Sequence, residues 1–246
     1  MYNLKDKFPE LEFYEDTHTY YVSGEKYPSV SSLISNFYEP FNTDGIAMGY
    51  ARKHGFDVEE VKQAWKGKSK RSTDAGTEIH KFGEDYAYHR YFGIGEKPVV
   101  LDKQCLGIVQ FWNDLPDRYT PVELELQMYS KLYKYCGTAD KILYDYETDS
   151  YVISDWKTNE SLTSDYNKNP LFHIPEELGL VQDGFGKYTL QFSFYQILLE
   201  EVGVKVTDRI LVWLQEQEDK KLYKTFHTKD VTEHLRKWLI QNMEDF

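Results

Sequence analysis

The amino-acid sequence predicts a mixed α/β protein built as one large domain. Patterns typical of strands occur in the ranges 11–28, 122–157 and 207–227. Segments with the apolar periodicity of amphipathic helices lie between these ranges and after the last of them. The 246 residues match the length of one large domain, with or without an appendage.

Composition limits the classes of protein to which the chain can belong. No apolar run approaches the roughly 18 residues that a membrane helix needs, and residues 1–7 lack the hydrophobic stretch of a signal peptide. The two cysteines, Cys105 and Cys136, are too few for a disulfide framework or a four-cysteine cluster. We therefore expect a cytoplasmic protein with no membrane partner and no iron–sulfur cluster.

The first quarter of the chain predicts small elements followed by helices. Residues 11–28 alternate and turn as a β-hairpin or meander does. Ser29 is placed to cap a short helix that would bury the apolar side chains of residues 30–34. Residues 45–54 and 58–66 have helical periodicity.

The densest basic run of the chain consists of Lys62, Lys66, Lys68, Lys70 and Arg71. The net charge of −12, from 41 acids and 29 bases, does not by itself indicate a nucleic-acid binder. Net charge governs solubility and steering, however, and leaves open what a local surface binds. The run therefore has two interpretations, which are a solvated loop and a set of phosphate contacts.

A helix predicted to open at Gly76 carries a histidine that could bind a metal. His80 and Glu84 are four residues apart and so lie on one face of this helix. A satisfied structural histidine is the alternative interpretation. A further amphipathic helix is predicted over residues 101–115, with Leu101 among its inward-facing residues.

The clearest chemical signal is Asp155-Trp156-Lys157, at the end of a buried strand. Residues two apart on a strand point to the same face, so Asp155 and Lys157 project together. A solvated ion pair would explain the two residues alone. A carboxylate beside a lysine can also hold a divalent cation and orient the attacking water at a phosphodiester site.

Hairpin register predicts a second acid beside this pair. If the turn between the two strands is centred between Glu147 and Thr148, Asp140 lies directly opposite Asp155. Their Cβ atoms would then be about 4.5–5.5 Å apart, a separation that suits two carboxylates sharing a cation. If the turn is centred one residue later, Asp140 faces Lys157 instead.

A third acid is expected on the preceding strand, where residues 122–129 alternate strictly. Glu125 could supply it. Glu123 has the same parity, so the pattern cannot separate the two.

The C-terminal half continues with a long irregular stretch and a clear helix. Residues 159–188 are rich in Asn, Gly, Pro and Ser, and a loop of this length is usually functional or mobile. The helix that follows, over residues 188–200, places Gln191 and Tyr195 on one face. Further strands are predicted at 207–215 and 221–227, and a last helix at 229–244.

Several short motifs occur in one order along the chain. They are Gly76-Thr77-x-x-His80, Gly137-Thr138-Ala139-Asp140, Asp155-Trp156-Lys157-Thr158 and Gln191-x-x-x-Tyr195, with a strand glutamate before the second. This series resembles the PD-(D/E)xK nuclease superfamily and its RecB-like exonuclease branch, in particular phage-encoded members and the mitochondrial genome maintenance exonuclease. The resemblance covers about residues 26–215. The proline in the superfamily's name is absent before Asp140, and the four-cysteine cluster of some relatives is missing.

The resemblance implies a fold and a set of site residues. The fold would be a mixed central sheet flanked by helices, a restriction-endonuclease-like core at 73–246 with a substrate-guiding hairpin and helical segment at 1–72. The implied metal ligands are His80, Asp140, Asp155 and the main-chain carbonyl of Trp156, with Lys157 and Glu125 as further catalytic residues. The implied substrate-binding residues are Thr77, Thr158, Gln191, Tyr195, Lys66, Lys68, Lys70 and Arg71. An oxygen-rich ligand set with one imidazole suits Mg²⁺ or Mn²⁺.

The function implied is a metal-dependent DNA exonuclease that hydrolyses phosphodiester bonds. We expect its partners to be DNA and phage or host proteins of replication and recombination, in the cytoplasm of the host cell. A structure-specific endonuclease on the same fold is one alternative. A non-catalytic DNA-binding protein that keeps the nuclease fold is the other.

Overall fold

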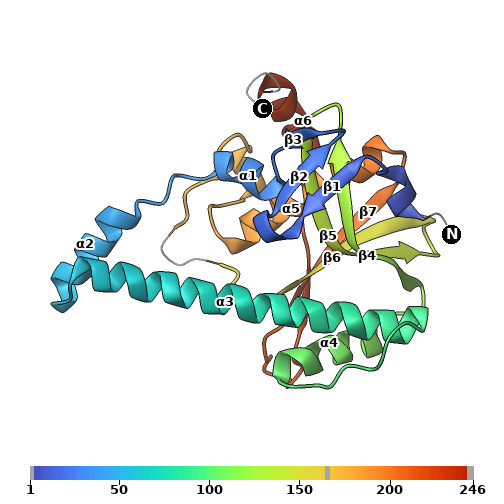
Figure 1. Ribbon diagram of the computed structural model, residues 1–246, viewed down its shortest axis with the longest axis horizontal. Helices are drawn as coiled ribbons and strands as arrows, with labels where there is room; N and C mark the ends of the chain where they lie inside the picture. Colours follow the sequence, from blue (N-terminus) through green and yellow to red (C-terminus); the bar gives the residue numbers. More distant parts are fainter. Residues whose placement is uncertain (1–2, 164–166, 243–246) are drawn as a thin grey trace.

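A five-stranded mixed sheet forms the centre of the molecule (Figure 1), in a computed structural model that describes residues 3–163 and 167–242. Its strand order is β4-β5-β6-β7-β8, with β6 and β7 parallel and the other pairs antiparallel. The strands are β4 (Tyr119–Ser130), β5 (Tyr135–Asp145), β6 (Ser150–Lys157), β7 (Val206–Trp213) and β8 (Lys224–His227). The predicted mixed sheet flanked by helices is confirmed.

The N-terminal meander is also confirmed. It forms a separate antiparallel sheet of β1 (Leu11–Tyr14), β2 (Thr19–Val22) and β3 (Glu25–Tyr27). The Ser29 hydroxyl accepts a hydrogen bond from the Ser32 amide at 3.2 Å and caps α1 (Val30–Ile34). The apolar side chains of α1 then join the core beside the central sheet.

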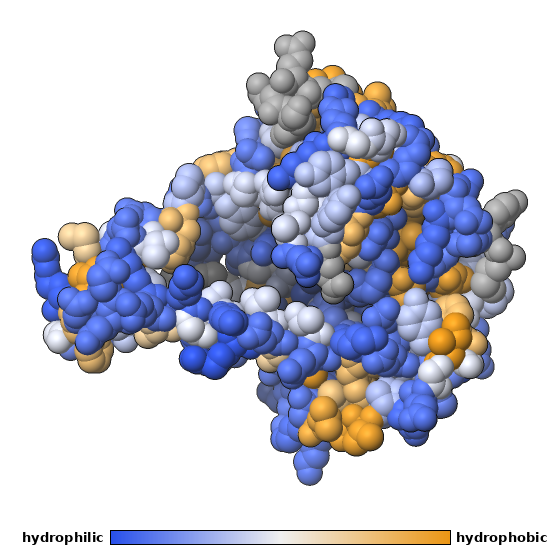
Figure 2. Space-filling model, in the orientation of Figure 1, coloured by the Kyte–Doolittle hydropathy of each residue, from blue (hydrophilic) through white to orange (hydrophobic). Residues whose placement is uncertain are grey.

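Two helices follow and project from the body as an arm, which we define as residues 43–73 (Figures 1 and 2). They are α2 (Thr43–His54) and the first half of α3 (Val58–Ala87). Two predictions are wrong here, namely the loop over the basic run and the start of a helix at Gly76, because α3 is continuous for 30 residues. The predicted boundary between residues 72 and 73 falls inside this helix.

Two apolar layers enclose the central sheet. On one face, α5 (Gly184–Glu201) packs with α1, the meander and α6 (Thr232–Asn242). The C-terminal part of α3 and α4 (Lys103–Asp114) cover the other face. Leu101 does not face inward as predicted but is 82% exposed, because α4 begins only after its cap at Asp102. Residues 243–244, the end of the predicted last helix, lie outside the described residues.

None of the helices in the two described ranges combines the length and apolar character that a membrane span requires. Both cysteines are buried thiols.

Gly83 sets how closely α3 approaches the sheet. A Cβ atom at this position would lie 2.6 Å from Nε1 of Trp156 on β6, whose bulky ring is itself buried. We expect Gly83→Ala to lower the free energy of unfolding by about 1–3 kcal/mol, because α3 or the indole must move. Urea unfolding measures this. Gly49→Ala is the control, since Gly49 is an exposed helical glycine with no atom near its Cβ position, and it should stabilise by about 0.5–1 kcal/mol.

Candidate metal centre and catalytic face

The hairpin of β5 and β6 brings two acids together at the end away from its turn. Its register pairs Lys141 with Ser154 and Asp145 with Ser150, so the next position along places Asp140 opposite Asp155. The register with the turn centred between Glu147 and Thr148 is therefore confirmed. The amide of Trp156 donates to Oδ2 of Asp140 at 3.3 Å, which fixes that carboxylate against β6.

A histidine from the opposite layer meets the same carboxylate. His80 lies on α3, and its Nδ1 is 2.8 Å from Oδ2 of Asp140. Glu125 on β4 completes a group of three, since one donor atom from each of His80, Glu125 and Asp140 lies within 4.8 Å of the others. Three elements distant in sequence thus converge on one point.

A local backbone irregularity decides which glutamate of β4 reaches this group. Glu125 has a φ of +48°, in the left-handed region that residues other than glycine rarely occupy. As a result Leu124 packs in the α3–α4 layer while Leu126 packs in the α5 layer, although both have the same parity. Glu123 instead accepts a hydrogen bond from the Leu4 amide at 3.0 Å. Glu125 is the acid at the centre.

The lysine of the motif lies on the α5 side of the sheet. Lys157 forms an ion pair with Oδ2 of Asp155 and places its Nζ 4.5 Å from the centre of the Tyr188 ring. The Tyr188 hydroxyl donates to Oδ1 of Asn159 at 2.6 Å, which holds the ring in place. The lysine side chain is only 13% exposed, so its charge acts in a partly dry environment.

Crowding of charge shifts several pKa values in this centre. Burial and then the Asp140 charge raise the pKa of Glu125 to about 8, and the same two causes raise that of Asp155 to about 7. Burial opposes protonation of His80, but the charge and hydrogen bond of Asp140 outweigh it and raise the His80 pKa to about 9. The pKa of Asp140 falls well below its ordinary value despite burial, because His80 faces it.

The residues fit a divalent cation. Oδ1 of Asp155 is buried and has no hydrogen-bond partner among the described residues, a costly state for a carboxylate oxygen. A small cavity of about 10 Å³, lined by His80, Glu84, Glu125 and Asp140 among others, adjoins the centre. A donor set of carboxylate oxygens with one imidazole matches Mg²⁺ or Mn²⁺.

Removal of the imidazole should weaken this cation site. We expect His80→Ala to raise the dissociation constant for Mn²⁺ at least about tenfold, since the ligand and its hold on Asp140 are both lost. Calorimetric titration of the metal-free protein with Mn²⁺ measures it. His227→Ala is the control, because His227 pairs with Asp208 at 2.7 Å outside this centre and its side chain is 65% exposed. A His80→Ala titration that overlays the wild-type curve would contradict the assignment.

The other predicted substrate residues outside the basic run lie on α5, directly after β6 and on α3. Gln191 donates to the Tyr195 hydroxyl at 2.8 Å, and the Tyr195 ring packs on Gly137 near the two acids. Thr158 directly follows Lys157 and approaches α3, because its Oγ1 lies 3.9 Å from the Cβ position of Gly76. Thr77 is exposed on α3, and its hydroxyl donates to the Thr73 carbonyl.

The basic run is not part of the centre but lies on the same helix. Lys66, Lys68, Lys70 and Arg71 are all exposed. Along α3 the residues 66, 70, 73, 77 and 80 are spaced by four and three, so Lys66, Lys70 and His80 share one helical face. At about 1.5 Å per residue, Lys70 is about 15 Å and Lys66 about 21 Å from His80 along the axis.

Two residues near the centre were not predicted. Tyr188 supports Lys157, and its spacing of three and seven residues to Gln191 and Tyr195 was a usable signal, since all three share one helical face. Lys141 is buried with its Nζ 3.4 Å from the centre of the Trp156 ring, and burial lowers its pKa to about 7. Nothing in the sequence pattern distinguished Lys141 from other strand lysines.

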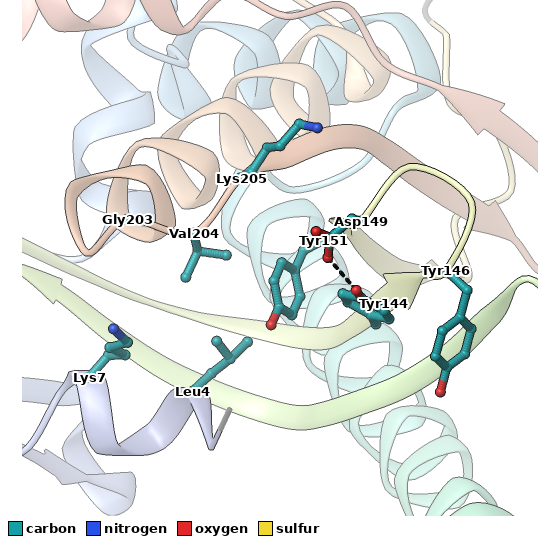
Figure 3. Close-up of a pocket in the computed structure, with 9 residues that line it drawn as sticks. All are labelled: Leu4, Lys7, Tyr144, Tyr146, Asp149, Tyr151, Gly203, Val204 and Lys205. Carbon is teal, nitrogen blue, oxygen red and sulfur yellow. Dashed lines mark hydrogen bonds between the residues drawn. The ribbon is translucent and has the colours of Figure 1, made fainter. Parts of the chain in front are cut away.

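A separate, wider cavity of about 610 Å³ lies at the turn end of the same hairpin (Figure 3). Tyr144 and Tyr151, which are cross-strand partners, line it together with residues of the N-terminus and of the loop after α5. The Ile142–Ile153 pair, fully buried, lies between these tyrosines and the two acids. The cavity is therefore distinct from the metal centre.

No protein-family model matches the chain, and no curated protein matches it. Among solved structures, it is similar to the crystal structure of a candidate exonuclease from Eubacterium rectale, with 17% identity over 88% of this chain and 70% of that chain. The TM-score of 0.38 is low, so functional inference depends on the geometry of the site.

Proposed function

We propose that the chain is a divalent-metal-dependent DNA nuclease of the RecB-like PD-(D/E)xK type that acts as an exonuclease. The observation that carries the proposal is the convergence of His80, Glu125 and Asp140 on one point, with the Asp155–Lys157 pair opposite Asp140 across the hairpin. The carboxylates of Glu125, Asp140 and Asp155 repel one another when all are ionised, and a cation between them removes that cost. A lysine on the same face then completes a phosphodiester-cleaving arrangement.

In this proposal the four side chains hold Mg²⁺ or Mn²⁺, with the carbonyl of Trp156 as a further ligand. Such a cation supplies Lewis-acid stabilisation of the phosphate and lowers the pKa of water. The Trp156 amide holds Asp140 in its ligating orientation, and His80 reinforces it from α3. Because these groups lie on rigid elements, little reorganisation is needed when substrate binds.

Lys157 acts as a cation rather than as a base. Burial disfavours its charge, but Asp155 and Asp140 outweigh burial and raise the pKa of the ammonium group. It is therefore protonated at neutral pH and can donate hydrogen bonds to the attacking water or to a phosphate oxygen. Asp155 and the ring of Tyr188 fix the position of its Nζ.

The remaining predicted residues form the path of the substrate in this proposal. Gln191 and Tyr195 line the α5 side, and Thr158 and Thr77 lie between the centre and the arm. Lys66, Lys68, Lys70 and Arg71 contact phosphates further along α3, because exposed bases in an acidic protein attract a polyanion. Residues 1–72 guide substrate to a catalytic core at 73–246, and the biological role is phage DNA replication, recombination or processing.

Cleavage of end-labelled linear DNA, compared with closed-circular DNA of the same sequence, tests the proposal. We expect degradation of the linear substrate in Mg²⁺ or Mn²⁺, none in EDTA, and an intact circle. Cleavage of the circle would establish the endonuclease alternative. If the protein binds DNA but cleaves no DNA form, with or without metal, the non-catalytic alternative is established.

A further inference from the structure

The tip of the arm, which we define as residues 50–58 where α2 ends and α3 begins, exposes aromatic side chains that the body does not cover. Within residues 43–73 the buried residues are only Ala47, Ala51 and Val61, which pack on one another between α2 and α3. Tyr50 (42% exposed) and Phe56 (56%) are exposed at the tip, and Ile46 (46%) lies about one helical turn before Tyr50 on the same side of α2. Figure 2 shows apolar surface at this tip among hydrophilic residues. Such exposure needs a binding partner to explain it.

The rings of Tyr50, His54 and Phe56 lie together at the tip, with interplanar angles between 15° and 33°. Tyr50 lies 4.3 Å from His54 at an interplanar angle of 33°, and Phe56 is inclined by only 15° to Tyr50 and 19° to His54. Trp65 on α3 packs edge-on against Tyr50 at 5.9 Å and holds it in place. Gly55, with a φ of +73°, ends α2 and turns the chain so that Phe56 returns beside Tyr50. The rings thus form a preorganised aromatic surface.

Charge identifies the kind of partner. The arm carries seven lysines and arginines against four acids, an excess of positive charge in a protein of net charge −12. Three of the acids are already engaged, since Asp57 caps α3 and Lys62 pairs with Asp44 at 2.7 Å and with Glu59 at 3.1 Å. Six of the seven bases remain exposed, namely Arg52, Lys53, Lys66, Lys68, Lys70 and Arg71. A positive surface with exposed aromatic rings is suited to a polyanion with planar groups.

We propose that the tip of the arm is a binding site for single-stranded nucleic acid, on which unpaired bases stack while the arm's lysines and arginines hold the phosphates. A duplex would offer its phosphates but not the faces of its bases, so the aromatic surface selects single strands. The proposal rests on the nuclease function above and deepens it by naming the form of the substrate.

The distance between tip and metal centre sets a length requirement. Trp65, against which Tyr50 packs, precedes His80 by 15 residues, or about 22 Å along α3. At the roughly 3.4 Å per nucleotide of a stacked strand, about seven nucleotides span this distance. A strand that reaches the metal centre and the tip together must be at least that long.

Fluorescence anisotropy in EDTA tests the proposal without requiring cleavage. A labelled single-stranded 30-mer and the matched 30-base-pair duplex are titrated with the wild-type protein and with a Tyr50→Ala/Phe56→Ala variant. We expect the variant to bind the single strand at least about tenfold more weakly, and the duplex with little change, because base stacking contributes only for unpaired bases.

Three variants serve as controls. Tyr146→Ala removes a tyrosine that is 56% exposed outside the arm and should leave both affinities unchanged. Tyr50→Phe keeps the ring and should retain binding, which separates stacking from misfolding. Lys66→Gln/Lys70→Gln should weaken both DNA forms and reduce the salt dependence of binding, since phosphate contacts are lost in each.

The outcomes distinguish this proposal from the nuclease function. The aromatic site is overturned if the Tyr50→Ala/Phe56→Ala variant binds the single strand as tightly as the wild type does. It is also overturned if the variant loses the same affinity for the single strand and for the duplex. Neither result bears on whether the protein cleaves DNA. The aromatic site is likewise overturned if sedimentation shows that the wild type self-associates and the variant does not, because the tip would then be a protein interface. Failure of the wild type to bind or cleave any DNA overturns the nuclease function instead.

Discussion

Lys157→Ala and Asp155→Asn are each expected to reduce DNA cleavage in Mg²⁺ by at least about a hundredfold. Lys157 forms an ion pair with Asp155, and its Nζ lies 4.5 Å from the centre of the Tyr188 ring. Asp155→Asn keeps the side-chain shape but removes the negative charge beside Asp140. The site should therefore bind a cation more weakly. Release of labelled nucleotides from linear DNA at saturating Mg²⁺ measures both effects.

Matched controls separate chemistry from folding in this experiment. Lys131→Ala removes a lysine whose ion pair with Glu10 is exposed on both sides, and should cleave like the wild type. Circular dichroism should show that both active-site variants keep the native fold. Undiminished cleavage by either Lys157→Ala or Asp155→Asn would contradict the assignment of this face as the catalytic site.

Raising the pH from about 5 to 9 is expected to destabilise the metal-free protein. In the folded state the pKa of Glu125 is raised from 4.5 to about 8 and that of Asp155 from 3.8 to about 7, chiefly by burial. The unfolded chain therefore releases these protons at lower pH than the folded chain, and stability falls as pH rises through the interval between. His80, with its pKa raised from 6.5 to about 9 by Asp140 in spite of burial, acts in the same direction above pH 6.5. Lys141, with its pKa lowered by burial from 10.5 to about 7, opposes the trend above pH 7 but does not cancel the three other groups.

A bound cation should reverse this trend, because it binds the deprotonated carboxylates and the neutral imidazole. The rise in Tm produced by Mn²⁺ should therefore be larger at pH 8 than at pH 6. Thermal unfolding in EDTA and in Mn²⁺ across this range provides the measurement, and Glu125→Gln should flatten the EDTA series. A Tm in EDTA that is constant or rises with pH would show that these groups do not carry buried charge.

The β-hairpin of the site was predictable from sequence because its geometry is local. A short turn flanked by two alternating strands leaves few registers, and Asp140 and Asp155 are equidistant from the centre of that turn. The choice between Glu123 and Glu125 was not predictable. It depends on a left-handed backbone conformation at Glu125 that inverts the alternation of β4, and alternation is the only signal that a strand sequence offers.

The arm shows the limit of reading helices from apolar periodicity. Around the basic run α3 has no core to face, so the pattern that marks amphipathic helices is absent there and a loop was the expected structure. The high intrinsic helix propensity of lysine, arginine, glutamine and alanine was the signal that would have extended the helix. Packing of Gly83 on Trp156 then anchors the C-terminal end of that helix to the sheet.

Because α3 is one continuous helix, it behaves mechanically as a lever whose fulcrum is the close contact at Gly83. His80 lies about 4.5 Å from that fulcrum along the axis, and Trp65 about 27 Å from it. A tilt that moves the tip by 6 Å therefore moves the imidazole by about 1 Å. A shift of several ångströms at the far end would therefore leave the end that carries His80 almost in place.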